Sequence, residues 1–306
     1  MRNGTIRLLG IVLPALLALT SATRAAERAA VNRRTGLYEL PMTDLRKASE
    51  RGDRAELARV AARLGPARLA KALQDSDRRT VLAALDSIPL LSSGILLLEG
   101  VLPLFASIDE TIRGHAVGAA AALLAVSDSA SLADWEVAGE TAQATCQALA
   151  LLAAKEAEPL STRLLAIQGL ADAPAVCATS RKSAELLAAS REPEIRRAAV
   201  LGLLPSSVSM AVLATAAQDR NGAVAAAAGA RLCERRGKNQ PLPAEPPLRK
   251  LALTEGALPE DIIGMLPCLA GSADSADRKA IEELQASGTT TVREAIKRLQ
   301  EKDGSR

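Results

Sequence analysis

The residues that could do acid–base or metal chemistry are few and far apart in this sequence. His115 is the single histidine, and an imidazole on a helix with no identifiable partner is more often structural or solvated than catalytic. The four cysteines, Cys146, Cys177, Cys233 and Cys268, lack the close spacing of zinc ligands. We therefore expect no metal, no cofactor and no catalytic residue.

Other catalytic signatures are also missing from the sequence. It contains no glycine-rich phosphate loop, no nucleophile elbow and no two-histidine zinc helix motif. Carboxylate pairs occur at Glu282 and Glu283 and at Asp274 and Asp277, but a solvated helix face explains them. The sequence predicts a protein that is not an enzyme.

Four arginines recur in one pattern, with Ala or Val three residues later and an aliphatic residue seven residues later. They are Arg78, Arg113, Arg163 and Arg196, and Ala225 takes the place of a fifth. A row of cations could bind an acidic partner or phosphate groups. A hydrogen-bonded ladder inside the fold is the interpretation we favour.

These five positions form what we call the arginine column. Each of them follows a break in the helical pattern, and the break carries residues that favour the start of a helix. Acidic or polar caps satisfy the free N–H groups of a first turn, and proline fits the first helical position. A second helical segment lies upstream of each break, at residues 67–73, 95–105, 140–155, 183–189 and 208–217. The breaks are Asp75-Ser76-Asp77, Ser107-Ile108-Asp109, Glu158-Pro159, Glu192-Pro193-Glu194 and Asp219-Arg220-Asn221-Gly222. Repeated helical hairpins are therefore expected.

Composition agrees with packed helices. Hydrophobic residues make up 48% of the chain but aromatic residues only 1%, so the core must be built from Ala, Leu, Val and Ile. Sheet proteins are enriched in β-branched and aromatic residues with alternating polarity, which this sequence does not show.

Residues 192–203, EPEIRRAAVLGL, closely resemble the second helix of a HEAT repeat, and residues 109–116 are a second match. The resemblance covers residues 66–234 and is weaker at 45–64 and beyond 246. It implies an all-α, right-handed α-solenoid of HEAT-type hairpins with a C-terminal helical cap. The long step before Arg163 implies a long first helix or an extra turn around residues 127–140.

The resemblance also implies roles for particular residues. The column arginines would pair with turn carboxylates of their own or adjacent repeats, and the second helices would form a concave wall that binds a protein or peptide. In the irregular region after Asp134, Trp135 is a core anchor or an interface contact. The turn carboxylates are Asp75, Asp77, Asp109, Glu158 and Glu192, and the candidate partner contacts are Arg79, Asp86, His115, Trp135, Gln168 and Arg197.

The first 25 residues have the pattern of a secretory signal peptide. Arg2 and Arg7 precede a short apolar stretch, and Thr23 and Ala25 provide a small-x-small cleavage site. We expect an exported protein, periplasmic or secreted, with no membrane span after signal removal. In an oxidising compartment the even cysteine count favours disulfides, and we prefer Cys146 with Cys177 and Cys233 with Cys268 over other pairings or free thiols.

The expected organisation has five parts. Residues 1–25 are the signal peptide, 26–36 a flexible stretch, 37–236 the HEAT-repeat solenoid, 237–247 a proline-rich loop or hinge, and 248–302 C-terminal helical repeats that form a cap.

Three classes of function remain open after these arguments. A non-catalytic scaffold that binds a protein or peptide is the leading hypothesis, ahead of a HEAT-like lyase or other enzyme subunit and of a structural component of an envelope assembly. Nucleic acid is not expected as a partner. The excess of three basic residues equals the three arginines of the leader, and the aromatic residues are only Tyr38, Phe105 and Trp135.

Overall fold

The computed structural model shows an all-α protein whose described residues contain no strand. The predicted signal peptide (1–25), the stretch predicted to be flexible (26–36) and residues 237–246 of the proline-rich segment lie outside the described residues. The structure describes residues 41–125, 132–173, 176–177, 181–203, 210–236 and 247–303.

The chain divides into two compact units, one up to Leu91 and the other from Ser92 onward. In unit 1, residues 41–50 are helical, and the helices that follow them pack against one another. These elements are α2 (Arg54–Leu64), α3 (Pro66–Ala72), α4 (Arg78–Ser87) and the short 3-10 helix η1 (Ile88–Leu90).

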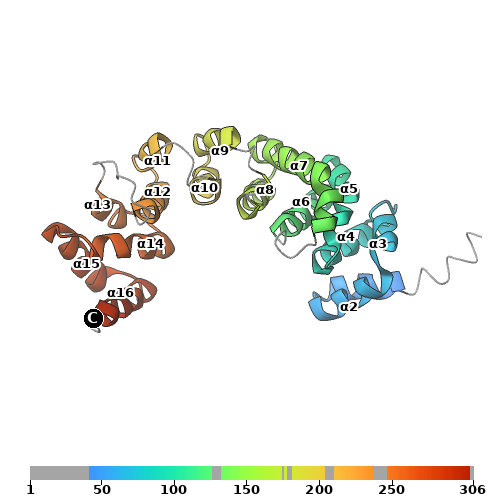
Figure 1. Cartoon of the computed structure of the whole chain (residues 1–306), viewed down its shortest axis with the longest axis horizontal. Coiled ribbons are helices and arrows are strands. Elements are labelled where there is room, and N and C mark those ends of the chain that lie inside the picture. The colour runs from blue at the N-terminus through green and yellow to red at the C-terminus, as the bar shows by residue number, and fades with distance from the viewer. Residues whose placement is uncertain are drawn as a thin grey trace, which may run out of the picture. The chain divides into compact units, whose positions relative to one another are not determined.

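Unit 2 is a series of helix pairs arranged in two layers (Figure 1). The first-helix layer contains α5 (Leu98–Val101), α7 (Leu132–Ala154), α9 (Arg181–Ala188), α11 (Met210–Ala216) and α13 (Leu248–Ala252). The second-helix layer contains α6 (Glu110–Ala125), α8 (Leu160–Asp172), α10 (Pro193–Ala198) with the π-helical turn η6 (Ala199–Leu203), α12 (Gly222–Arg236) and α14 (Pro259–Ala270). Each second helix packs on the next, so the unit has the architecture of a helical repeat protein.

The end of unit 2 is a helical hairpin, α15 (Ser275–Ser287) and α16 (Thr290–Asp303), which packs on α14. Four helices, α13 to α16, follow the proline-rich loop, and the helices on the two sides of residues 237–246 contact each other directly.

The break signals act as helix caps. Asp77 and Asp109 accept hydrogen bonds from the backbone N–H groups of Arg79 and Thr111, at 3.1 and 2.9 Å. Pro193 occupies the start of α10, where a missing N–H costs nothing. Local capping chemistry therefore fixes where the second helices begin.

Two first helices differ in detail from what the sequence predicts. Residues 95–105 are helical, as expected, but they are not one α-helix, because the 3-10 segments η2 (Gly94–Leu97) and η3 (Leu102–Ala106) flank the single turn of α5. Pro103, near the start of η3, lacks the N–H that a continuing α-helix needs. Trp135 does not lie in an irregular region, since its backbone belongs to α7; its side chain is outside the described part.

Neighbouring second helices touch through their smallest residues. A Cβ atom placed on Gly169 of α8 would lie 2.7 Å from Ala121 Cβ of α6, and one placed on Gly264 of α14 would lie 2.9 Å from Ala230 Cβ of α12. The helices can approach this closely only because glycine has no side chain there. The scarcity of aromatic residues thus reflects close helix packing.

Gly169→Ala is expected to lower the free energy of unfolding by about 1 to 3 kcal/mol, because the added methyl overpacks the α6–α8 contact. Gly118→Ala in α6 is the matched control, since its Cβ would lie 4.0 Å from Leu165 Cδ1. The control should stabilise the protein by up to about 1 kcal/mol through helix propensity. Urea unfolding followed by circular dichroism measures both changes, and equal effects at the two glycines would contradict the overpacking argument.

Candidate functional site

Three of the column arginines form a ladder along unit 2, which we call the arginine ladder: Arg113, Arg163 and Arg196. Each guanidinium binds a carboxylate in the turn of the following repeat, across 3.0, 3.0 and 2.6 Å to Glu158, Glu192 and Asp219. Each also donates to a backbone carbonyl beside its own turn, those of Ser107, Ala153 and Ser190. The arginine ladder therefore links successive repeats from inside the fold.

The arginine ladder lowers the pKa values of its carboxylates. Lys155 and then Arg113 hold the pKa of Glu158 below its ordinary value. Ser190 and then Arg163 hold the pKa of Glu192 at about 2, from an ordinary 4.5. These carboxylates stay ionised and paired at neutral pH, which is the behaviour of structural ion pairs.

Asp219 shows the same net result through opposing effects. Burial alone would raise its pKa, but hydrogen bonds from Arg196 and from the N–H of Asn221 outweigh burial and lower it. Asp219 belongs to a break signal in the sequence, but the predicted turn carboxylates did not include it.

Unit 1 contains an ion pair that the repeat pattern does not reveal. Arg46 binds Asp77 at 2.7 Å, and hydrogen bonds from Thr80 and then Arg46 lower the pKa of Asp77. Arg78, the column member of this unit, begins α4 and is exposed. Asp75 accepts the N–H of Asp77, so it shapes the turn.

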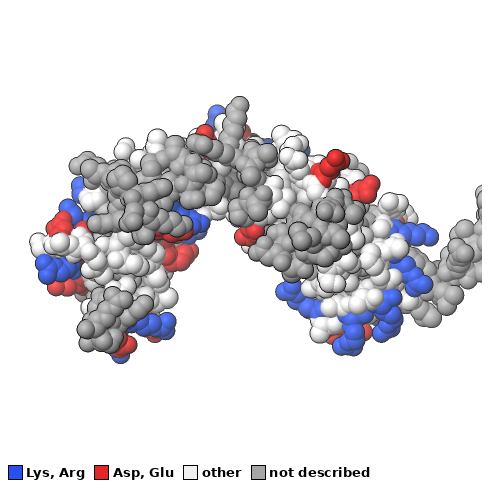
Figure 2. Space-filling view, in the orientation of Figure 1, with Lys and Arg blue, Asp and Glu red and all other residues white. Residues whose placement is uncertain are grey.

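Basic side chains gather on the exposed surface of unit 1 (Figure 2). Several of them take part in ion pairs within the unit, because Arg59 binds Glu56 and Arg79 lies 3.7 Å from Glu50. Exposed pairs of this kind contribute little to stability. The exposed basic residues of this surface include Lys47, Arg51, Arg54, Arg59, Arg63 and Arg68.

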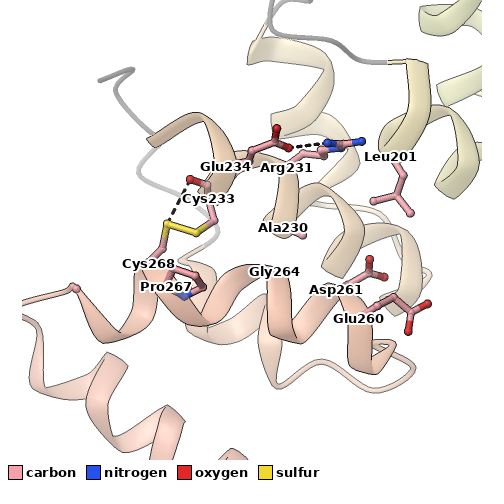
Figure 3. Close-up of a pocket in the computed structure, with 11 residues that line it drawn as sticks. Leu201, Ala230, Arg231, Cys233, Glu234, Glu260, Asp261, Gly264, Pro267 and Cys268 are labelled. Atoms are coloured by element: carbon pink, nitrogen blue, oxygen red, sulfur yellow. Dashed lines mark hydrogen bonds and ion pairs between the residues drawn. A yellow bond between two sulfur atoms is a disulfide. The ribbon is translucent and has the colours of Figure 1, made fainter. Parts of the chain in front are cut away.

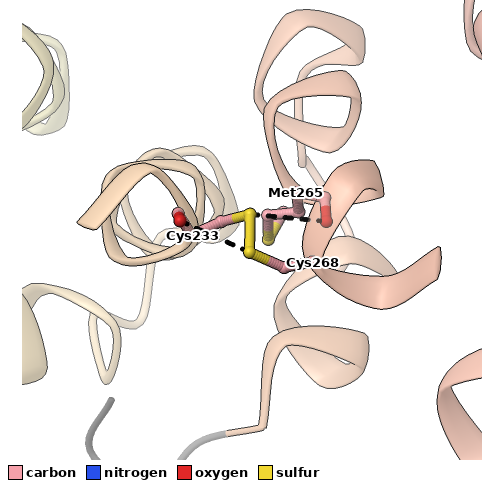
Figure 4. The surroundings of a disulfide bond; sticks show 3 residues. All are labelled: Cys233, Met265 and Cys268. Carbon is pink, nitrogen blue, oxygen red and sulfur yellow. Dashed lines mark hydrogen bonds between the residues drawn. A yellow bond between two sulfur atoms is a disulfide. The ribbon is translucent and has the colours of Figure 1, made fainter. Parts of the chain in front are cut away.

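Two disulfides connect elements of unit 2. Cys146 is bonded to Cys177 and Cys233 to Cys268, which are the sequential pairings that the cysteine positions favoured. The second bond joins α12 to α14, with Cys233 Sγ lying 3.8 Å from the Met265 carbonyl oxygen (Figure 4). Each disulfide closes a loop of about one repeat, so each fixes neighbouring helices.

A groove opens where three successive second helices meet, and we call it the α12–α14 groove. Its volume is about 770 Å³. Figure 3 shows the Cys233–Cys268 disulfide near one end and Glu260 and Asp261 near the other, with Ala230 and Gly264 between them. The remaining lining residues are Leu201, Arg231, Glu234, Pro267 and Gly271.

An ion pair between helices that are not consecutive borders the groove. Arg197 of α10 donates to Asp261 of α14 at 3.1 and 2.9 Å and to Glu260 at 3.0 Å. The side chain of Asp261 is only 3% exposed, and this burial, outweighing Arg197, raises its pKa. Arg197 thereby ties α10 to α14 across the end of the groove.

Arg231 lies in the groove with an unsatisfied donor. Its NH1 group pairs with Glu234 of the same helix. Its Nε is buried and has no hydrogen-bond acceptor among the described residues. Buried donors without an acceptor are uncommon in folded proteins.

The predicted partner contacts are distributed over both units. Arg79 and Asp86 belong to unit 1, where Asp86 accepts a hydrogen bond from Ser49 at 2.6 Å. His115 and Gln168 are exposed on α6 and α8. Arg197 is only 22% exposed at its side chain and serves the internal ion pair described above.

The groove residues escaped the sequence analysis because no local signal marks them. Apart from the two cysteines, Leu201 and Pro267, they are small residues and charged residues that look like ordinary helix surface. The pairing of Arg197 with Asp261 spans 64 residues. Only the stacking of three repeats places these side chains side by side.

One of the two carboxylate pairs first considered for chemistry has a structural partner. Asp274 and Asp277 both bind Arg249, at 2.9 and 3.1 Å. Across the described segments, no group of three potential ligands is arranged to hold a metal ion. Nor, in that part of the chain, does any helix combine the length and hydropathy needed to cross a membrane.

No protein-family model matches the chain, and no curated protein matches its sequence. Among solved structures, an engineered protein is similar with a TM-score of 0.41 and 14% identity, over 78% of this chain and 95% of its own. A designed armadillo repeat protein in complex with the peptide (KR)4 has a TM-score of 0.39 and 15% identity, over 85% and 97% of the two chains. Both scores are low, so neither structure nor its ligand bears on what this chain binds.

Proposed function

We propose that this protein is a non-enzymatic interaction module that binds a partner protein through its second-helix layer. The α12–α14 groove carries the proposal. It is an open cavity on three successive repeats, and a disulfide and the Arg197–Asp261 ion pair hold its walls. A rigid groove loses little conformational entropy on binding, which favours recognition over chemistry.

We further propose that the fold is a right-handed solenoid of HEAT type, with α15 and α16 as its C-terminal cap, and that the protein is exported. The residues 192–203 that resemble a HEAT second helix support this type. Two disulfides and the leader pattern of residues 1–25 support export, since disulfides persist in oxidising compartments.

Site-specific photo-crosslinking tests the function. A benzophenone amino acid at Gln168 or Gly271 in the second-helix layer is compared with one at Leu186 in α9, which is 64% exposed. We expect a discrete crosslinked partner from the first two positions and none from Leu186. Equal crosslinking from both layers, or none from either, would contradict the proposal. Mass spectrometry of the same samples should show a mature chain that begins at residue 26.

A further inference from the structure

The α12–α14 groove has features that select the chemistry of its ligand. We propose that it binds a peptide segment of a partner protein in which one lysine or arginine is flanked by small apolar residues. This inference rests on the proposed function and names the kind of segment that the groove accepts.

The floor of the groove lets a peptide main chain come close. α12 and α14 meet through Ala230 and Gly264, and no long side chain separates them at that point. Leu201, Pro267 and the disulfide give the neighbouring surface an apolar character. A volume of about 770 Å³ lies within the range of pockets that enclose small ligands, so a short segment fits while a whole domain does not.

The charge of the groove favours a cation. Three carboxylates line it, Glu234, Glu260 and Asp261, against one guanidinium, that of Arg231, among the described lining residues. Arg197 reaches two of these carboxylates, Glu260 and Asp261, so three carboxylates face two guanidinium groups among the described residues. The side chain of Glu260 is 63% exposed, so it can accept a further hydrogen bond from an incoming ammonium or guanidinium group.

The charge of the groove also selects against an acidic ligand. Glu234 and Glu260 would repel an acidic or phosphorylated segment. A basic side chain on an otherwise small and apolar main chain fits both the carboxylates and the closely packed floor of the groove.

Peptide selection on the full, disulfide-bonded chain tests this inference. The probe is a phage-displayed library of random dodecapeptides, followed by fluorescence anisotropy of the enriched sequences as labelled synthetic peptides. We expect one aligned position to hold Lys or Arg with Ala, Gly, Val or Leu around it. Replacing that residue with Gln should weaken binding about tenfold.

Variants of the chain locate the interaction. The double variant Glu234→Gln/Glu260→Gln should lose about tenfold in affinity for the basic peptide and discriminate poorly against its Gln counterpart. The matched control is Glu283→Gln, an exposed carboxylate of α15 outside the groove, which should bind as the parent chain does. Thermal unfolding of each variant checks that the fold is retained.

The outcomes separate this inference from the proposed function. Enriched peptides without a basic residue, basic peptides that bind the double variant unchanged, or no enrichment at all would each overturn the basic-segment inference. If crosslinks from Gln168 or Gly271 still capture a partner, the interaction module stands without this ligand class. If those crosslinks also fail, both proposals fall.

Discussion

Replacing Arg163 with Met is expected to lower the free energy of unfolding of unit 2 by about 3 kcal/mol. Arg163 is 3% exposed and donates to the Ala153 carbonyl at 2.9 Å and to Glu192 at 3.0 Å. Methionine has a similar length but no donor, so it fills the space and leaves the buried carbonyl without its partner. Urea unfolding followed by circular dichroism measures the loss.

The pH dependence of this loss has a definite sign. The pKa of Glu192 is about 2 in the folded protein against an ordinary 4.5. A carboxyl group whose pKa is lowered on folding stabilises the folded state at pH values above its ordinary pKa. This stabilisation is lost as the pH falls through the pKa that the group has in the folded state. The difference in the free energy of unfolding between the parent chain and Arg163→Met should therefore be largest above pH 4.5 and shrink toward pH 2.

Lys297→Met is the matched control for Arg163→Met. Lys297 faces solvent on α16, 3.9 Å from Glu301 one helical turn away, so its loss should cost less than about 0.5 kcal/mol. A deficit in Arg163→Met that stays constant from pH 5 to pH 2 would mean that packing alone is responsible. A deficit no larger than that of Lys297→Met would mean that the arginine ladder is not a stabilising link.

The arginine ladder shows how far repeat reasoning reaches from a sequence. Arg113, Arg163 and Arg196 could be aligned because each follows a capping break, and Glu158 and Glu192 lie in the breaks that come next. Capping and spacing are local properties of the chain, so they are visible before the fold is known. The starts of the second helices were predictable for the same reason.

Other features depend on tertiary packing and left no local trace. Arg46 pairs with Asp77 from a helix ahead of the repeat column, and the break of residues 94–106 into short helices conflicts with their apolar pattern. The groove depends on Arg197 meeting Asp261 after two further repeats have stacked. A sequence pattern cannot show this contact because neither residue differs from an ordinary surface residue of its helix.

Removing the Cys233–Cys268 disulfide is expected to affect both stability and binding. The bond closes a separation of 35 residues, and the double variant Cys233→Ser/Cys268→Ser should lose about 3 to 4 kcal/mol of unfolding free energy. Both cysteines also line the α12–α14 groove. We expect affinity for the selected basic peptide to fall about tenfold. Without the disulfide, α12 and α14 are no longer linked, so their contact must be ordered again on binding.

The other disulfide provides the matched comparison. Cys146→Ser/Cys177→Ser opens a separation of 31 residues, so the loss of stability should be similar, but these cysteines do not line the groove. Anisotropy measured at a temperature where both variants remain folded separates the two effects. Equal loss of affinity in both variants would attribute binding to general stability. A loss of affinity confined to Cys233→Ser/Cys268→Ser would mean that this disulfide acts on the groove directly. A general loosening of unit 2 would follow from the removal of either disulfide.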